Sequence, residues 1–506
     1  MRKLQETTKQ AGRWLLYVVV AGLLASCGGA RSKDSALNST EENQISRPNV
    51  LFIAVDDLRP RLSAYGDPAA VTPNIDRLAA SGMLFNRAYC QQAVCNPSRA
   101  SVMTGRRPDA TKVWNLSTHF RKALPDVITL PQYFKQHGYH TRCVGKIYHD
   151  PAAAQDSISW SAPETLAVTG NAGPKYLLDS NLHRKGGWKG SATERMDVPD
   201  SAYVDGMVGN AALRVLREIS DKPFFLAVGF RRPHLPFSAP EKYWALYDDK
   251  KLPQPANPEA PAGVPAIAMH PSTELRGYAD IPDQGPLDEA TIHRLLQGYY
   301  AGTSYIDAQI GRLLDELNAL GLASNTIVVL WSDHGYHLGE HNLWSKTTNF
   351  ELDTRVPLII SAPGISKNDQ QTDALAELVD LYPTLADLAG IGVPQGLEGT
   401  SLVPVLKDPD RPWKKGAFSQ FPRPWFYKGK PEVMGYSVRT DRYRYTEWQD
   451  FQTGEVQARE LYDHQTDQME TKNLAGESKY NSTIDKLSDL LARGWKGALP
   501  GESSVK

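Results

Sequence analysis

"NVLFIAVDD", residues 49–57, is the stretch that decides the fold, because an apolar run of strand length ends there directly in two aspartates. Further apolar runs of strand length follow at residues 139–145, 223–230, 325–331 and 356–363. Segments with the apolar spacing of helices lie between the runs, at residues 72–82, 128–138, 293–321 and 373–390. Since near-continuous apolar strands that alternate with helices are typical of parallel sheets covered on both faces, we predict an α/β fold with a large, mostly parallel sheet sandwiched by helices.

The composition changes after about residue 405, where Pro and aromatic residues become frequent. Residues 434–448, "MGYSVRTDRYRYTEW", alternate as antiparallel strands do, and residues 480–495 have a helical pattern. We therefore predict a main domain over residues 48–405 and a smaller α+β subdomain with an antiparallel sheet over residues 406–506. Two long excursions poor in apolar periodicity, residues 150–200 and 246–290, are expected to shape a ligand pocket.

The N-terminus has the features of an export signal. Basic residues precede an apolar run from Trp14 to Ala25 that is short for a membrane span, and Leu24-Ala25-Ser26-Cys27 resembles a bacterial lipobox. We predict a lipoprotein signal over residues 1–27 with a lipidated Cys27, and a polar tether over residues 28–47. The expected location is the bacterial outer membrane, facing the periplasm or the cell surface and held by the lipid anchor alone. An ordinary cleaved signal with an incidental Cys27 is the alternative.

Charge and cysteine content narrow the possible functions. The chain has 56 basic and 57 acidic residues, a net charge of -1 and no long run of either sign, which argues against nucleic-acid binding. Cys90 and Cys143 end apolar segments and are expected to be buried thiols, with a bridge between them as the alternative. Cys95, in the polar stretch "VCNPSRASVMTGRRP", needs a separate explanation.

Carboxylates follow two of the predicted strands. Asp56 and Asp57 come directly after residues 49–55, and Asp333 and His334 follow the run that begins at residue 325. Ligands of open α/β sheets bind outside the carboxyl ends of the strands, so these groups are expected to share one edge. Because clustered carboxylates repel one another unless a cation compensates, the pattern predicts a hard divalent metal, calcium or magnesium. For a single Asp, a turn or cap position is the simpler interpretation.

Basic side chains follow two other predicted strands. Lys146 and His149 come after residues 139–145, and Arg231, Arg232 and His234 come after residues 223–230. Each could be a solvated loop residue by itself. Together with a divalent metal they would suit an anionic tetrahedral group, which indicates a phosphate or sulfate ester as the substrate.

The stretch around Cys95 resembles the signature of type I sulfatases, which belong to the alkaline-phosphatase-like superfamily. "CNPSR" at residues 95–99 and "TGRRP" at residues 104–108 carry this resemblance. It extends over most of the chain, and among sulfatases it is nearest to the iduronate-2-sulfatase branch, in "VDDLRP", "RRPHLPF", "SDHGYHLGEHNLW", "VPLIISAPG" and "MGYSVRTDRYRYTEW". The resemblance implies that a formylglycine-generating enzyme oxidises Cys95 to formylglycine (3-oxoalanine) before folding. Pro97, Ser98 and Arg99 would then form a recognition tag and, in the folded site, a turn with a charged clamp.

The resemblance also implies ligands and catalytic groups for this sulfuric ester hydrolase. One Ca²⁺ would be held by Asp56, Asp57, Asp333, His334 and the modified Cys95. Arg99 would hold the formylglycine and its sulfate adduct, and the sulfate would be surrounded by Lys146, His149, His234 and Lys346. One hydroxyl of the hydrated aldehyde would attack sulfur. His234 or Lys346 would protonate the leaving sugar oxygen, and His149 would take the proton of the second hydroxyl to release sulfate.

The expected substrate is a sulfated oligo- or polysaccharide. The expected target of hydrolysis is the 2-O-sulfate of an iduronate or other uronate, in a glycosaminoglycan or in an algal polymer such as ulvan. Tyr336 and His337 stand where the iduronate-2-sulfatase pattern tends to have Trp and Ala, and we expect both to face the pocket. Arg439, with Arg442 and Arg444, could bind a uronate carboxylate beside sugar-stacking faces of Tyr436 and Trp448, or these five side chains could only pack the hairpin.

Two alternatives are retained. One is a phosphonate or phosphate monoester hydrolase of the same superfamily, because the metal and the cations suit both anions. The other is a non-catalytic, lipid-anchored protein that binds glycans on a degenerate sulfatase fold.

Overall fold

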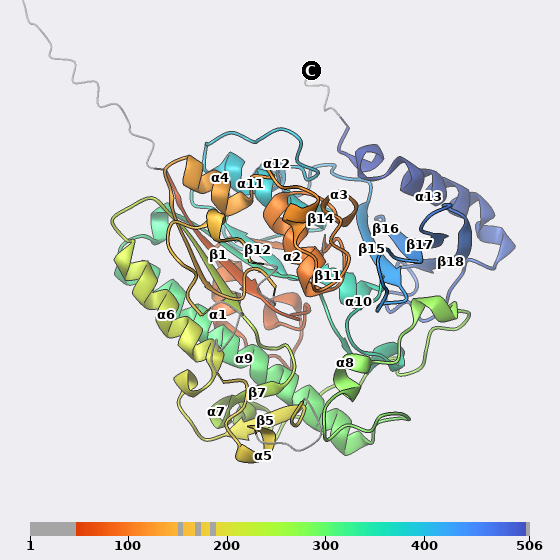
Figure 1. The fold of residues 1–506 in the computed structure, drawn as a ribbon, viewed down its shortest axis with the longest axis horizontal. Helices are drawn as coiled ribbons and strands as arrows, with labels where there is room; N and C mark the ends of the chain where they lie inside the picture. The colour runs from red at the N-terminus through yellow and green to blue at the C-terminus, as the bar shows by residue number, and fades with distance from the viewer. Residues whose placement is uncertain (1–46, 150–154, 167–173, 183–188, 502–506) are drawn as a thin grey trace, which may run out of the picture. The chain divides into compact units, whose positions relative to one another are not determined.

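The computed structural model describes residues 47–149, 155–166, 174–182 and 189–501 (Figure 1). The predicted signal with Cys27, and the predicted tether apart from Arg47, lie outside these residues. Among the described helices, none combines the length and the apolar character needed to cross a bilayer.

A seven-stranded sheet forms the centre of the described fold. Its strands in spatial order are β13 (Gln370–Thr372), β2 (Met83–Phe85), β12 (Leu358–Ser361), β8 (Thr326–Ser332), β1 (Asn49–Val55), β6 (Phe224–Phe230) and β4 (His140–Gly145). All neighbouring strands pair in parallel except β12, which is antiparallel to both β2 and β8. The predicted large, mostly parallel sheet is therefore confirmed.

Strand β1 shows why this sheet is covered on both faces, because every one of its residues is buried. Leu51, Ile53 and Val55 pack into one apolar core, and Val50 and Phe52 pack into another. Such two-sided burial follows from the alternation of side chains along a strand. The longer helices whose apolar residues join the first core are α1 (Pro73–Ala80), α6 (Val204–Glu218) and α9 (Glu289–Ala319). Helices that join the second are α2 (Cys95–Thr104), α4 (Leu130–Gln136), α11 (Leu381–Leu388) and α12 (Val403–Lys407).

The C-terminal part forms an antiparallel sheet with a helix on it, as predicted (Figure 1, blue). Its strands, in order, are β15 (Ala417–Arg423), β16 (Val433–Arg439), β17 (Tyr443–Asp450) and β18 (Val456–Asp463). Helix α13 (Asn481–Arg493) packs Leu487 and Leu490 against Val438 on one face. On the other face, Trp448 packs with Leu343 and Phe350.

Short elements complete the described fold. The short helices are α3 (Pro108–Thr111), α5 (Asp179–Leu182), α7 (Glu241–Trp244), α8 (Thr273–Arg276) and α10 (Glu351–Thr354). The remaining strands form three small sheets: β3 (Ala88–Tyr89) with β11 (Arg355–Val356) and β14 (Ala376–Glu377); β9 (His337–Leu338) with β10 (Trp344–Ser345); and β5 (Thr193–Met196) with β7 (Phe237–Pro240).

Two local predictions are wrong. Residues 95–99 begin helix α2 instead of forming a turn, because Pro97 lies in the first helical turn, where a missing N–H breaks no intrahelical hydrogen bond. The helix expected over residues 373–390 begins only at Leu381. Before it, Ala376–Glu377 pairs with β3, and the buried Glu377 carboxylate contacts Arg107 and Lys414, so tertiary contacts override the local helical pattern.

Candidate functional site

The strand register brings the predicted carboxylates together. Strands β1 and β8 are parallel neighbours with Val55 opposite Ser332, so Asp56 and Asp333 leave adjacent strand ends side by side. Asp57 has a φ of 60°, a left-handed conformation that Asp tolerates better than most residues, and its backbone N–H donates to Asp333 Oδ1 at 3.3 Å. The three carboxylates are fully buried, with exposed fractions of 0–1%.

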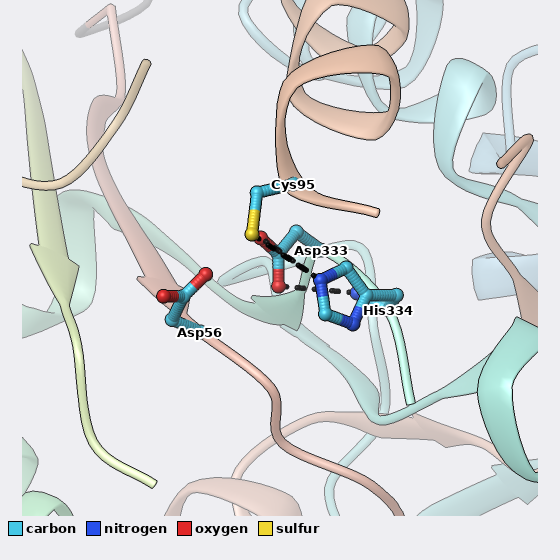
Figure 2. A group of neighbouring side chains, drawn as sticks. All are labelled: Asp56, Cys95, Asp333 and His334. Carbon is cyan, nitrogen blue, oxygen red and sulfur yellow. Dashed lines mark hydrogen bonds and ion pairs between the residues drawn. The ribbon is translucent and has the colours of Figure 1, made fainter. Parts of the chain in front are cut away.

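Helix α2 begins at Cys95 and places this side chain next to Asp56 and Asp333 (Figure 2). The Cys95 Sγ atom lies 3.4 Å from His334 Nε2 and 3.6 Å from Lys146 Nζ. Burial, together with the charge of Asp56, raises the pKa of the Cys95 thiol well above its usual value. An unmodified thiol is therefore held in its poorly nucleophilic protonated form.

Arg99 lies one helical turn after Cys95 and ties the helix to the strand ends. Its Nε donates to Asp333 Oδ2 at 2.8 Å and its Nη2 to Asp56 Oδ1 at 3.1 Å, while Nη1 donates to the backbone carbonyls of Lys146 and Ile147. The side chain has no exposed surface. Arg99 is thus brought to the site, but it contacts the carboxylates and does not line the cavity where we expected it to meet sulfate.

Two lysines form ion pairs with the carboxylates of Asp56 and Asp57. Lys146 Nζ contacts Asp56 Oδ2, and Lys346 Nζ lies 2.9 Å from Asp57 Oδ2. Burial alone would raise the pKa of Asp56, but Lys146, His234 and Arg99 hold it well below its usual value. Burial raises the pKa of Asp57 well above its usual value despite Lys346, because Asp56 and other carboxylates lie near it. The cluster therefore retains uncompensated repulsion that a cation would relieve.

The donor atoms suit a hard divalent cation. Single ligand atoms of Asp56, Cys95, Asp333 and His334 all lie within 4.8 Å of one another, and the same holds for Asp56, Asp57, Cys95 and His234. His334 Nδ1 lies 2.9 Å from the carbonyl oxygen of Gly335, so this nitrogen carries the proton and Nε2 presents its lone pair toward the cluster. Carboxylate oxygens and an imidazole lone pair are metal ligands, so the residues present fit the group.

A cavity of about 840 Å³ opens beside this cluster and is lined by Cys95, His149, His234 and Lys346. Burial and the charge of Lys146 hold the pKa of His149 well below its usual value, so its ring is neutral. Burial and Lys346 likewise lower the pKa of His234. Both His234 nitrogens nevertheless face acceptors, because Nδ1 lies 2.5 Å from the Leu235 carbonyl and Nε2 3.2 Å from Glu274 Oε1. A bound anion would favour protonation of this ring.

Glu274 is a cavity residue that sequence reasoning missed. It belongs to the short helix α8, in the excursion over residues 246–290, and its carboxylate lies 2.8 Å from Lys346 Nζ as well as near His234. Burial opposes ionisation, but Lys346 and His234 lower the pKa of Glu274 to about 2, so it is charged. No motif in this excursion marked Glu274. Lys189, from the other excursion, also lines the cavity.

Two of the predicted substrate contacts, Tyr336 and His337, are not in the cavity. The expectation that Tyr336 and His337 face the pocket is wrong, because both side chains have no exposed surface. Tyr336 stacks on Tyr299 at a ring-centroid distance of 5.6 Å, and His337 Nδ1 lies 2.6 Å from Asp353 Oδ1. Both residues come shortly after β8 in the sequence and lie in the packed interior, where neighbouring side chains cover them.

Three of the five predicted contacts from the C-terminal sheet are also internal. Arg439 is 5% exposed and contacts Glu351, so the expected contact with a uronate carboxylate is wrong. Arg444 contacts Glu351 and Glu470, and Trp448 is fully buried. The packing alternative for the hairpin holds for these three side chains. Cys90, Cys95 and Cys143 are buried and unpaired, as expected for Cys90 and Cys143.

Comparisons with known proteins agree with this geometry. The sequence profile of the family described as "Sulfatase" matches residues 48–391, and that described as "N-sulphoglucosamine sulphohydrolase, C-terminal" matches residues 339–496. Iduronate 2-sulfatase of Homo sapiens is 35% identical, over 93% of this chain and 98% of the relative. A sulfatase of Formosa agariphila is 32% identical, over 89% of this chain and 88% of the relative. The solved structure of phosphonate monoester hydrolase of Agrobacterium radiobacter is similar with a TM-score of 0.73 and 25% identity, over 88% of this chain and 95% of that one.

Proposed function

This chain belongs to the sulfatase family and is a sulfuric ester hydrolase, and from that premise we propose that it cleaves sulfate esters of carbohydrates, with the 2-O-sulfate of an iduronate or other uronate residue as the target. The observation that carries the proposal is the placement of Cys95 between buried carboxylates and a cavity lined by His149, His234 and Lys346. The sugar is inferred from the human relative, whose name specifies iduronate and the 2-position.

We assign the carboxylate cluster to a divalent cation, with Ca²⁺ as the ion that an oxygen-rich donor set favours. Asp56, Asp57, Asp333, His334 and the Cys95 side chain would hold it. A bound cation supplies positive charge to a sulfate ester and makes a coordinated hydroxyl more acidic. Arg99 and Lys146 position the ligands, because each contacts a carboxylate of the set.

The nucleophile in this proposal is formylglycine derived from Cys95, since burial keeps the unmodified thiol protonated. Hydration of the aldehyde would place two hydroxyl groups where the Sγ atom now lies, near Lys146 and His334. Neutral His149 is suited to accept a proton, and Lys346 or His234 to donate one to the leaving sugar oxygen.

Replacement of Cys95 tests the proposal. Cys95→Ala should bind sulfated disaccharide but lose nearly all turnover, because the nucleophile is absent while the cavity remains. Mass spectrometry of the wild-type peptide that contains Cys95, purified from the native host, should show the mass of formylglycine. Turnover by Cys95→Ala near the wild-type rate, or an intact thiol in fully active wild type, would refute the nucleophile assignment.

A phosphonate or phosphate monoester hydrolase is the second candidate, favoured by the similarity to the Agrobacterium hydrolase. Turnover of 4-nitrophenyl sulfate, 4-nitrophenyl phosphate and a 4-nitrophenyl phosphonate compares the anions with one leaving group. A larger kcat/KM for the sulfate supports the sulfatase proposal, and a larger value for either phosphorus ester supports the alternative.

A further inference from the structure

An aromatic loop lies at the mouth of the cavity. Residues 424–432, "PWFYKGKPE", connect β15 to β16, and Trp425 and Phe426 both line the cavity. Phe426 is 74% exposed, more than any other large apolar side chain in the described residues. Its ring lies 5.8 Å from that of Trp425, which lies 5.2 Å from the buried ring of Phe421. The exposed ring is thus supported from the core of the C-terminal sheet.

Basic side chains lie in the same loop and in the cavity wall. Lys428 and Lys430 follow Phe426 at alternate positions, are exposed, and have no ion pair within the described part of the chain. In the cavity wall, Lys189 Nζ donates to the carbonyl of Glu274 at 2.9 Å, and Arg276 donates to the carbonyls of Pro282 and Gly285. Neither side chain forms an ion pair within the described part of the chain, although Lys189 Nζ also lies 4.4 Å from the ring centroid of Tyr278 and near the charged Glu274. Two acidic residues, Glu274 and Asp283, line the same cavity, and Glu274 shares Lys346 with Asp57.

The size of the cavity indicates a ligand larger than one sugar. Its volume of about 840 Å³ lies toward the upper end of the roughly 300–1,000 Å³ that is usual for ligand pockets. The side chains around Cys95 line the part of the cavity where we propose that the sulfate ester is cleaved. The apolar and basic residues at the mouth take no part in that chemistry.

We propose that the rim, defined as Lys189, Arg276, Trp425, Phe426, Lys428 and Lys430, binds the sugar residues that flank the one whose sulfate is removed. The apolar face of a sugar ring packs on Phe426 and Trp425, and its sulfate or carboxylate groups meet the four basic side chains. The inference rests on the proposed function, since the ligand is the same class of sulfated carbohydrate. It assigns the flanking sugars of the expected oligo- or polysaccharide substrate to named residues at the mouth of the cavity.

Binding to a Cys95→Ala background tests this rim without turnover. Calorimetry would compare a heparin-derived hexasaccharide with a 2-O-sulfated uronate monosaccharide. In the triple variant Phe426→Ala, Lys428→Gln, Lys430→Gln we expect the Kd for the hexasaccharide to rise about tenfold, equivalent to about 1.4 kcal/mol, with a shallower salt dependence. The Kd for the monosaccharide should change by less than about twofold. Lys367→Gln, an exposed lysine elsewhere, is the matched control and should leave both constants unchanged.

The outcomes separate the two hypotheses. The rim proposal would be overturned if the triple variant and its Cys95→Ala background bound the hexasaccharide with equal affinity and had the same melting temperature. Equal losses for hexasaccharide and monosaccharide would overturn it too, because the rim would then not be specific to flanking sugars. If wild type hydrolyses 4-nitrophenyl sulfate but no sulfated saccharide, the proposed function fails, while a hexasaccharide affinity that depends on the three residues still supports the rim.

Discussion

Arg99 is the side chain on which the others of the cluster depend. Its guanidinium donates to two carboxylates and two carbonyl oxygens, and it is fully buried. Such a network fixes the carboxylates of Asp56 and Asp333 relative to Cys95, whose helix carries Arg99 one turn later. Arg99 is therefore a positioning residue, and its conformation is set before any substrate arrives.

The carboxylate of Asp333 gives a direct test of the metal proposal. Asp333→Asn should weaken Ca²⁺ binding by at least about tenfold, because a charged ligand becomes neutral. Calorimetric titration of the purified variant with CaCl₂ measures this independently of activity. Asp353→Asn is the matched control, because Asp353 is an equally buried carboxylate that contacts His337 and lies outside the candidate metal groups. Equal Ca²⁺ affinity of Asp333→Asn and wild type would show that the ion is misplaced.

The pairing of β4 with β6 positions Lys146. Gly145 lies opposite Gly229, and the Lys146 N–H donates to the Gly229 carbonyl at 2.8 Å. A Cβ added at Gly229 would lie closer than 3.0 Å to the backbone O, C and N atoms of Lys146. The backbones can approach only because this position has no side chain.

Gly229→Ala should therefore damage both stability and activity. We expect the free energy of unfolding to fall by about 3 kcal/mol, measured by urea denaturation, since the clash is with backbone that cannot rotate away. Turnover of 4-nitrophenyl sulfate should fall as well, because Lys146 must shift away from Asp56 and Cys95. Gly476→Ala is the control, since nothing lies within 4 Å of a Cβ there. Equal stability of the two variants would contradict the close approach.

Packing of the C-terminal sheet against α10 depends on a buried ionic cluster. Arg444 of β17 lies 2.5 Å from Glu351 of α10 and 2.7 Å from Glu470, and Arg439 also contacts Glu351. These side chains link segments far apart in the sequence. The same sheet carries part of the rim, because the loop with Phe426 joins β15 to β16.

Arg444→Met should destabilise the described fold by about 3 kcal/mol or more, because two buried carboxylates lose their shared partner. Urea denaturation followed by tryptophan fluorescence measures the loss. Arg442→Met removes a neighbouring arginine whose side chain is 48% exposed beside Asp463, and it should have a much smaller effect. If both variants lose equal stability, the buried cluster does not hold the sheet in place.

Strand positions and the carboxylate cluster were predictable from local patterns. Three of the apolar runs correspond to the fully buried strands β1, β6 and β8, because two-sided burial requires uninterrupted apolar residues. The run at residues 139–145 corresponds to β4, where His140 and Arg142 are half-buried, and the run at residues 356–363 corresponds to the short strands β11 and β12. Asp56 and Asp333 came together because parallel strands end at one edge. The direction of β12 and the helical state of residues 95–99 were not predictable in this way, since both depend on neighbouring segments.

There is a physical reason why the amino-acid sequence alone determined some of these features and only the tertiary structure decided the others. The amino-acid pattern alone determined the sheet, the residues at its carboxyl edge and the Cys95 signature, because burial and strand direction act through short periodic stretches. Only the tertiary structure decided which side chains reach the cavity: Glu274 and Phe426 line it, whereas Tyr336, His337 and Arg439 are covered. Exposure of a side chain depends on segments hundreds of residues away, and no local pattern encodes those contacts.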